Sequence, residues 1–99
     1  MKKLVRDKIP EIIRESTGKE PKIYIADDKE YYEELVKKLN EETQEFLESH
    51  EVEELADVLE VMYAIIKHKK ISLEEIENIR KEKAEKRGSF DKKYILESE

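Results

Sequence analysis

Four acidic side chains in the middle of the sequence have the spacing of a metal site. Glu42 and Glu45 are three residues apart, as are Glu54 and Asp57, so within a helix each pair projects from one face. The two pairs are symmetric about residues 49–50. An antiparallel turn there would place Glu45 opposite Glu54, and it would also bring Glu42 to Asp57. Four ionised carboxylates brought together repel one another unless they are protonated or bind a cation.

The position of Glu42 strengthens the case for a site. Alternating steps of three and four residues lead through Leu35, Leu39 and Phe46, and Glu42 takes a place in this series where a core residue is expected. A carboxylate in a core needs a partner. The alternative is that these residues, among 26 acidic ones, form solvated faces and ion pairs with lysines. Both interpretations stay open on the sequence pattern.

The ligand types indicate which metal would bind. Ligation by oxygen alone predicts Mg²⁺, with Mn²⁺ as the other candidate, because these hard ions prefer carboxylates and also bind substrate phosphates. A di-iron centre in a helical bundle would use Glu-x-x-His. Leu47 and Ile65 stand three residues before His50 and His68, so that pattern is absent.

Composition narrows the class of protein. A chain of 99 residues predicts a single domain over residues 1–99. The absence of cysteine excludes disulfides, thiolate metal sites and a cysteine nucleophile. The net charge of −6 argues against binding a nucleic-acid polymer. No stretch approaches the roughly 20 apolar residues of a membrane span, and the N-terminus lacks the apolar core of a signal peptide, so no membrane association and a cytoplasmic location are expected.

The spacing of apolar residues and the capping signals predict an all-α fold. Helices are expected over residues 9–17, 29–48, 51–69 and 73–87. An extended connection is expected over residues 19–26, and a short tail over 90–96 that folds back. The helix over 51–69 is apolar nearly all round, which predicts that it is buried on most sides. The expected architecture is a helical bundle built on a central antiparallel hairpin with short flanking helices, completed by oligomerisation.

Two motifs and both ends of the chain resemble a known family. The segment Leu-Asn-Glu-Glu-Thr-Gln-Glu at 39–45 and the segment Glu-Glu-Leu-Ala-Asp at 53–57 are similar to the paired Glu-x-x-Glu and Glu-x-x-Asp motifs of the MazG-like all-α nucleoside triphosphate pyrophosphohydrolases. Residues 3–10 and 83–90 look like the small phosphoribosyl-ATP pyrophosphohydrolase-like branch of that superfamily. Ser89 stands where the family motif has a second glycine.

The resemblance implies an enzyme and its site. Glu42, Glu45, Glu54 and Asp57 would be the catalytic residues and would ligate Mg²⁺, and a water would attack the α-phosphorus of a nucleotide substrate to give a nucleoside monophosphate and pyrophosphate. It also implies a homodimer or homotetramer. House-cleaning of the nucleotide pool is the expected role, with phosphoribosyl-ATP hydrolysis in histidine biosynthesis as the alternative within the enzyme class. A non-catalytic dimeric helical binding module is the alternative outside it.

Phosphate must also meet positive charge, and two basic clusters are candidates for substrate binding. They are Arg6 with Lys8 near the N-terminus, and Lys83, Lys86 and Arg87 on the last helix. Solvated surface is the alternative for each lysine, and the last two cations could also complement a helix C-terminus. Further candidates are side chains for orienting the water, Glu41 and Glu53, and rings for stacking on a base, Tyr31, Tyr32 and Phe90.

Overall fold

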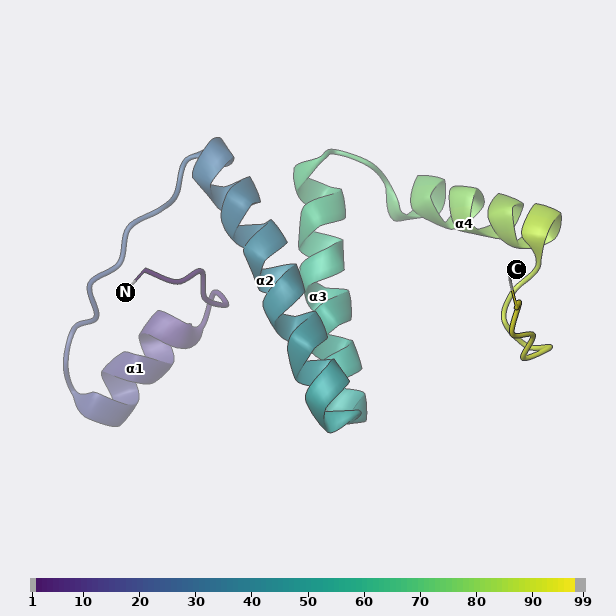
Figure 1. The fold of residues 1–99 in the computed structure, drawn as a ribbon. Coiled ribbons are helices and arrows are strands. Elements are labelled where there is room, and N and C mark those ends of the chain that lie inside the picture. Colours follow the sequence, from purple (N-terminus) through teal and green to yellow (C-terminus); the bar gives the residue numbers. More distant parts are fainter. Residues whose placement is uncertain (1, 98–99) are drawn as a thin grey trace.

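Two long antiparallel helices form the centre of the structure (Figure 1). The computed structural model describes residues 2–97, and every regular element within them is a helix: α1 (Ile9–Thr17), α2 (Asp28–Ser49), α3 (Val52–His68) and α4 (Leu73–Arg87). The predicted all-α fold with a central hairpin is confirmed, because α2 and α3 pack closely along each other. None of these helices combines the length and apolar character that crossing a membrane requires.

Local signals explain where the helices begin and end. The Asp27 side chain accepts a hydrogen bond from the Glu30 N–H at 2.8 Å and caps α2. Ser72 caps α4 in the same way through the Glu75 N–H. At the end of α2, His50 has a φ of 59°, and its N–H donates to the Phe46 carbonyl. This left-handed residue ends the helix and reverses the chain into α3, as the predicted turn at 49–50 requires.

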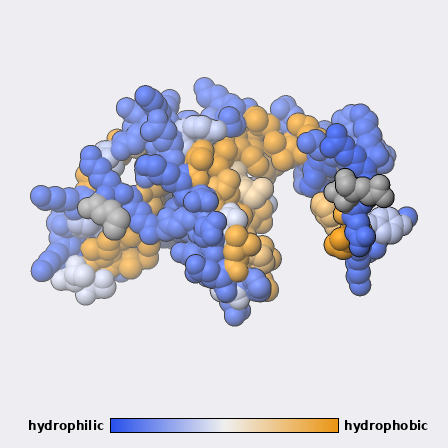
Figure 2. All heavy atoms as spheres, in the orientation of Figure 1, coloured by the Kyte–Doolittle hydropathy of each residue, from blue (hydrophilic) through white to orange (hydrophobic). Residues whose placement is uncertain are grey.

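The core of a single chain is very small. Leu35 and Val61 are its buried apolar residues, and Glu42 is the one buried charged residue in the described part of the chain. The prediction that α3 is buried on most sides is wrong for a single chain. Within residues 2–97 only α2 packs extensively on α3, and one helix can cover only one face of another. Figure 2 shows the hydrophobic surface that remains over α3, beside the hydrophilic surface of α2.

The flanking helices lie on opposite sides of the hairpin, α1 beside α2 and α4 beyond α3 (Figure 1). The Cα radius of gyration is 18.0 Å, whereas a compact domain of this length has one of about 13 Å. The tail after α4 does not fold back onto the helices as predicted, because Phe90, Tyr94 and Leu96 are almost fully exposed. The chain is therefore an extended arrangement of helices with one packed interface.

Candidate metal centre and adjoining cavity

The hairpin brings together three of the four predicted carboxylates. One oxygen each of Glu42, Glu54 and Asp57 lies within 4.8 Å of the others. Glu42 comes from α2, and the other two are three residues apart on the facing side of α3, so the turn at His50 sets their register. The predicted approach of Glu42 to Asp57 is confirmed. Glu45 is exposed and lies outside this group of three.

Burial and charge act together on Glu42. Its side chain lies in the interface between the helices, and the residue is only 9% exposed. Loss of solvation raises the pKa of Glu42, and a hydrogen bond with Glu45 and the negative charge of that neighbour raise it further. Lys38 opposes this shift from one turn earlier on α2, where its Nζ lies 3.6 Å from Glu42 Oε1. The ionised form of Glu42 therefore favours additional positive charge.

The N-terminal segment supplies part of that positive charge. Arg6 Nη2 donates a hydrogen bond to Asp57 Oδ1 at 2.8 Å. Lys3 Nζ lies 3.0 Å from Glu41 Oε1, and this bond lowers the pKa of Glu41. The structure thus places Arg6, a predicted substrate-binding residue, beside one of the carboxylates, and its role in substrate binding stays a prediction. Residues 2–8 run past the middle of α2 before α1 begins, which positions both cations (Figure 1).

A cavity of about 540 Å³ adjoins the acidic group. The N-terminal segment forms one wall through residues 4–8, and α2 and α3 form the others. The charged lining residues are Asp7, Glu42, Asp57, Glu60, Arg6, Lys8, Lys38 and Lys67; the aromatic ones are Tyr31 and Tyr63. Its size lies in the usual range for sites that hold small molecules. The cavity thus combines carboxylates, cations and aromatic rings next to the candidate metal ligands.

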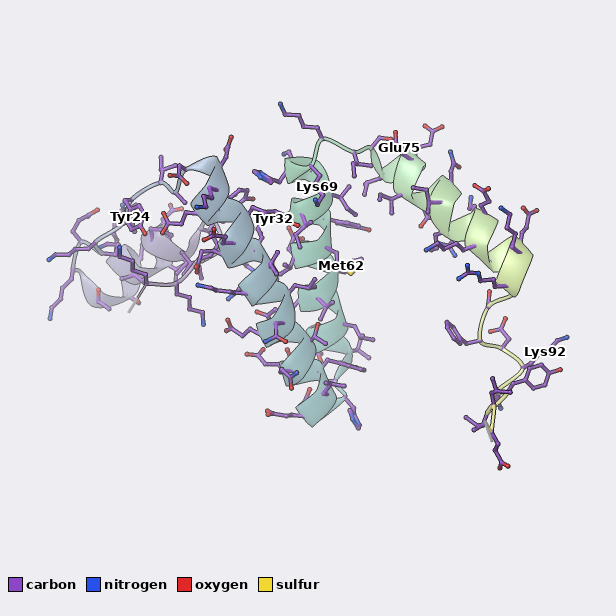
Figure 3. All side chains as sticks on the ribbon, turned by 45° about the horizontal axis from the view of Figure 1, so that its top comes forward. Tyr24, Tyr32, Met62, Lys69, Glu75 and Lys92 are labelled. Carbon is purple, nitrogen blue, oxygen red and sulfur yellow. The ribbon has the colours of Figure 1, made fainter. Side chains whose placement is uncertain are left out.

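The aromatic residues at the open end of the hairpin differ in what they contact. Tyr32 stacks on His68, with ring centroids 5.8 Å apart, and Lys69 Nζ lies 4.9 Å from the centre of the same tyrosine ring (Figure 3). His68 and Lys69 therefore both contact the Tyr32 ring. Tyr31 contacts His68 in an edge-on arrangement of the two rings. Tyr31 and Tyr63 both line the cavity. The cavity tyrosines are therefore better placed to stack on a base than Tyr32.

The basic residues of α4 lie away from this site. Lys83, Lys86 and Arg87 do not line the cavity, and α4 extends away from the hairpin (Figures 1 and 3). Lys86 Nζ is 3.4 Å from Glu82 Oε1 on its own helix. Within one chain the structure does not bring these cations to the carboxylates. Their predicted role in substrate binding stays a prediction.

The sequence analysis did not single out several residues that line the cavity, among them the cations Lys38 and Lys67 and the acidic residues Asp7 and Glu60. The signal for Lys38 was available, because a residue four positions before Glu42 shares its helix face. Lys67 stands seven residues after Glu60, which also lines the cavity, and this spacing of nearly two helical turns returns to the same face. Tyr63, in the apolar stretch of α3, is 45% exposed and lines the cavity.

The three carboxylates fit a hard divalent cation. All the donor atoms are oxygens, which Mg²⁺ and Mn²⁺ prefer. Ligands on opposite sides of one Mg²⁺ are about 4.2 Å apart and neighbouring ligands about 3 Å, so the three oxygens, now within 4.8 Å of one another, would draw closer together to share one ion. The pKa of Glu42 is raised first by burial and then by Glu45, with Asp57 adding a smaller effect, and a cation bound at the group would oppose this shift.

Comparison with protein-family models, with curated proteins and with solved structures gives no match for this chain. The motif resemblance to the MazG-like family therefore stays a prediction.

Proposed function

We propose that the chain is a metal-dependent hydrolase of phosphate anhydrides. The observation that carries the proposal is the convergence of Glu42, Glu54 and Asp57 beside a cavity that Glu42 and Asp57 line together with the cationic side chains of Arg6, Lys8, Lys38 and Lys67. Oxygen ligands for a divalent ion next to arginine and lysine suit a substrate with several phosphates. A solvated acidic face has no reason to bury one of its carboxylates.

Within this class, a nucleoside triphosphate pyrophosphohydrolase fits the cavity best. The aromatic rings of Tyr31 and Tyr63 offer surfaces for a nucleobase, and the cations offer partners for a phosphate chain. The paired acidic motifs on α2 and α3 support the same reaction. We propose cleavage between the α and β phosphates, as a house-cleaning activity in the cytoplasm, with phosphoribosyl-ATP as the alternative substrate.

Each side chain has a definable task in this reaction. Glu42, Glu54 and Asp57 would hold Mg²⁺, which would activate a water and neutralise charge on the phosphate. Glu45, which is exposed beside Glu42, would accept a proton from the attacking water. Lys38 and Lys67 face the cavity and bind phosphate oxygens there.

The test is pyrophosphate release from a panel of nucleoside triphosphates and phosphoribosyl-ATP in the presence of Mg²⁺. Asp57→Asn removes one ligand charge at nearly constant shape, and we expect a loss of about 10²-fold or more in kcat. Glu48→Gln is the matched control, because Glu48 is an exposed carboxylate of α2 outside the acidic group. It should retain wild-type activity. Inactivity of the wild type on the whole panel would rule out the proposal.

We also propose that two copies of the chain associate through α3. Val52, Leu55, Leu59 and Met62 recur at helical spacing along this helix, and each is at least 43% exposed. Figure 3 shows Met62 on the side of α3 that points away from α2. An apolar stripe along a chain with so small a core favours a homodimer, with a homotetramer as the larger alternative.

The same stripe favours a second candidate function, a non-catalytic dimeric helical module. The two candidates differ in their response to Mg²⁺. The hydrolase predicts a Mg²⁺-dependent rise in melting temperature that disappears in Asp57→Asn, because a ligand that binds only the folded state stabilises it. The binding module predicts the same melting temperature with Mg²⁺ or with EDTA.

A further inference from the structure

We infer that Arg6 is a displaceable counter-ion of the metal site, which competes with the divalent cation for Asp57. When a cation binds, the Arg6 guanidinium leaves Asp57 and becomes available to a phosphate group, and the N-terminal wall of the cavity loosens. This inference deepens the proposed function and rests on its metal site. It concerns the regulation of that site by a segment of the same chain.

The Asp57 carboxylate has two candidate cationic partners, Arg6 and the divalent ion. Asp57 Oδ1 accepts the hydrogen bond from Arg6 at 2.8 Å, and Asp57 is also one of the three converging carboxylates. A guanidinium and a divalent ion on the same small carboxylate repel each other. Binding of the ion at Asp57 therefore weakens the bond to Arg6.

The Arg6 side chain is free to move. Its side chain is 58% exposed, and no other ion pair of Arg6 is present in residues 2–97. The guanidinium can thus turn away without leaving a buried charge unpaired. Because residues 4–8 line the cavity, a phosphate bound there lies within the range that this side chain can sweep.

Loss of the Arg6–Asp57 bond also affects the N-terminal wall of the cavity. Within the described residues, two ion pairs tie segment 2–8 to the hairpin: Lys3 to Glu41 on α2, and Arg6 to Asp57 on α3. If the Arg6–Asp57 ion pair is lost, the segment keeps its ion pair to α2 but has none to α3. Cation binding should therefore open the cavity on its α3 side, while the Lys3 end stays in place.

The experiment compares metal binding by the full chain in three forms: wild type, Arg6→Gln and Lys3→Gln. Each substitution removes one exposed cation of the same segment, but only Arg6 contacts a carboxylate of the group of three. Calorimetric titration with MgCl₂ and MnCl₂ should give binding about fivefold tighter for Arg6→Gln, as for release of an exposed ion pair. For Lys3→Gln the change should stay below about twofold.

A second readout needs no variant. The heteronuclear ¹H–¹⁵N NOE of residues 4–8 in the wild type, which reports the mobility of the backbone, should fall on adding saturating Mg²⁺, while that of α2 should not. If the wild type binds metal but the NOE of residues 4–8 is unchanged or higher, the inference is overturned and the metal site stands. The same holds if Arg6→Gln binds no more tightly than Lys3→Gln. Absence of metal binding by the wild type would overturn the proposed function itself.

Discussion

At the scale of single residues, the burial of Glu42 links the stability of the protein to pH and, in the proposed site, to metal binding. Its carboxylate is buried between α2 and α3, and its pKa is raised first by loss of solvation and then by Glu45, with Asp57 adding a smaller effect and Lys38 opposing it. A raised pKa in the folded state means that folding favours the protonated form. This contribution to stability is fully present below the ordinary pKa of glutamate and is lost as the pH rises through the folded-state pKa.

Replacing Glu42 by glutamine should therefore stabilise the metal-free protein at pH 7. The neutral amide avoids the cost of burying a charge, and we expect the melting temperature in EDTA to rise by a few degrees. Below about pH 4.3 the wild-type carboxyl is also neutral, so the difference should vanish. Circular dichroism melts at both pH values, with Glu48→Gln as control, measure this. A lower melting temperature for Glu42→Gln at pH 7 would contradict the assigned cause.

At the scale of elements, α2 and α4 are equally well capped but differently supported. Asp27 and Ser72 each accept a hydrogen bond from a backbone N–H in the first helical turn. The apolar face of α2 packs on α3, whereas α4 makes no comparably extensive contact within the described residues. Most helical stability in proteins comes from such packing. The two caps should therefore affect different measurements.

The Asp27→Ala change should lower the stability of the hairpin by about 1 kcal/mol, the usual effect of losing an N-cap. The Ser72→Ala change should reduce the helical signal near 222 nm without an equal fall in the hairpin's melting temperature, because α4 can fray alone in a single chain. Lys29→Ala in the first turn of α2 is the control. Equal loss of hairpin stability in Asp27→Ala and Ser72→Ala would show that α4 is coupled to the hairpin.

At the scale of the whole molecule, the extended shape of the chain leaves apolar surface exposed that a partner could cover. Its extents of 58 × 32 × 25 Å and its few buried residues leave most apolar side chains in contact with water. A stable domain of this size usually buries over half of the surface that its unfolded chain exposes. The stripe on α3 is the surface through which pairing with a second copy would correct this deficit.

A charge placed in the stripe should prevent that pairing. Leu59→Glu puts a carboxylate among the exposed apolar residues of α3, so we expect the mass in solution measured by light scattering to fall to that of one chain. Ile12→Glu is the matched control, since Ile12 is 53% exposed on α1 at the opposite side of the hairpin. An unchanged mass for Leu59→Glu, or an equal fall for Ile12→Glu, would contradict the assignment of the interface to α3.

The sequence by itself determined the four helices and the burial of Glu42. Caps such as Asp27 and Ser72 act within one helical turn, so their effect can be predicted from neighbouring residues. The register of Glu42 in the apolar series of α2 depends only on helical periodicity, and this residue is buried as predicted. The symmetric spacing about residues 49–50 likewise predicted that Glu42 meets Asp57, because a short turn fixes the register of a hairpin.

The tertiary structure alone decided which other residues join the site. Arg6 and Asp57 are 51 positions apart, and the path of the N-terminal segment across the hairpin leaves no local signal in the sequence. Helix α4, which carries Lys83, Lys86 and Arg87, lies away from the carboxylates. This separation also depends on the path of the chain between the helices. Periodicity shows which residues share a helix face, but contacts between distant segments depend on how whole elements pack.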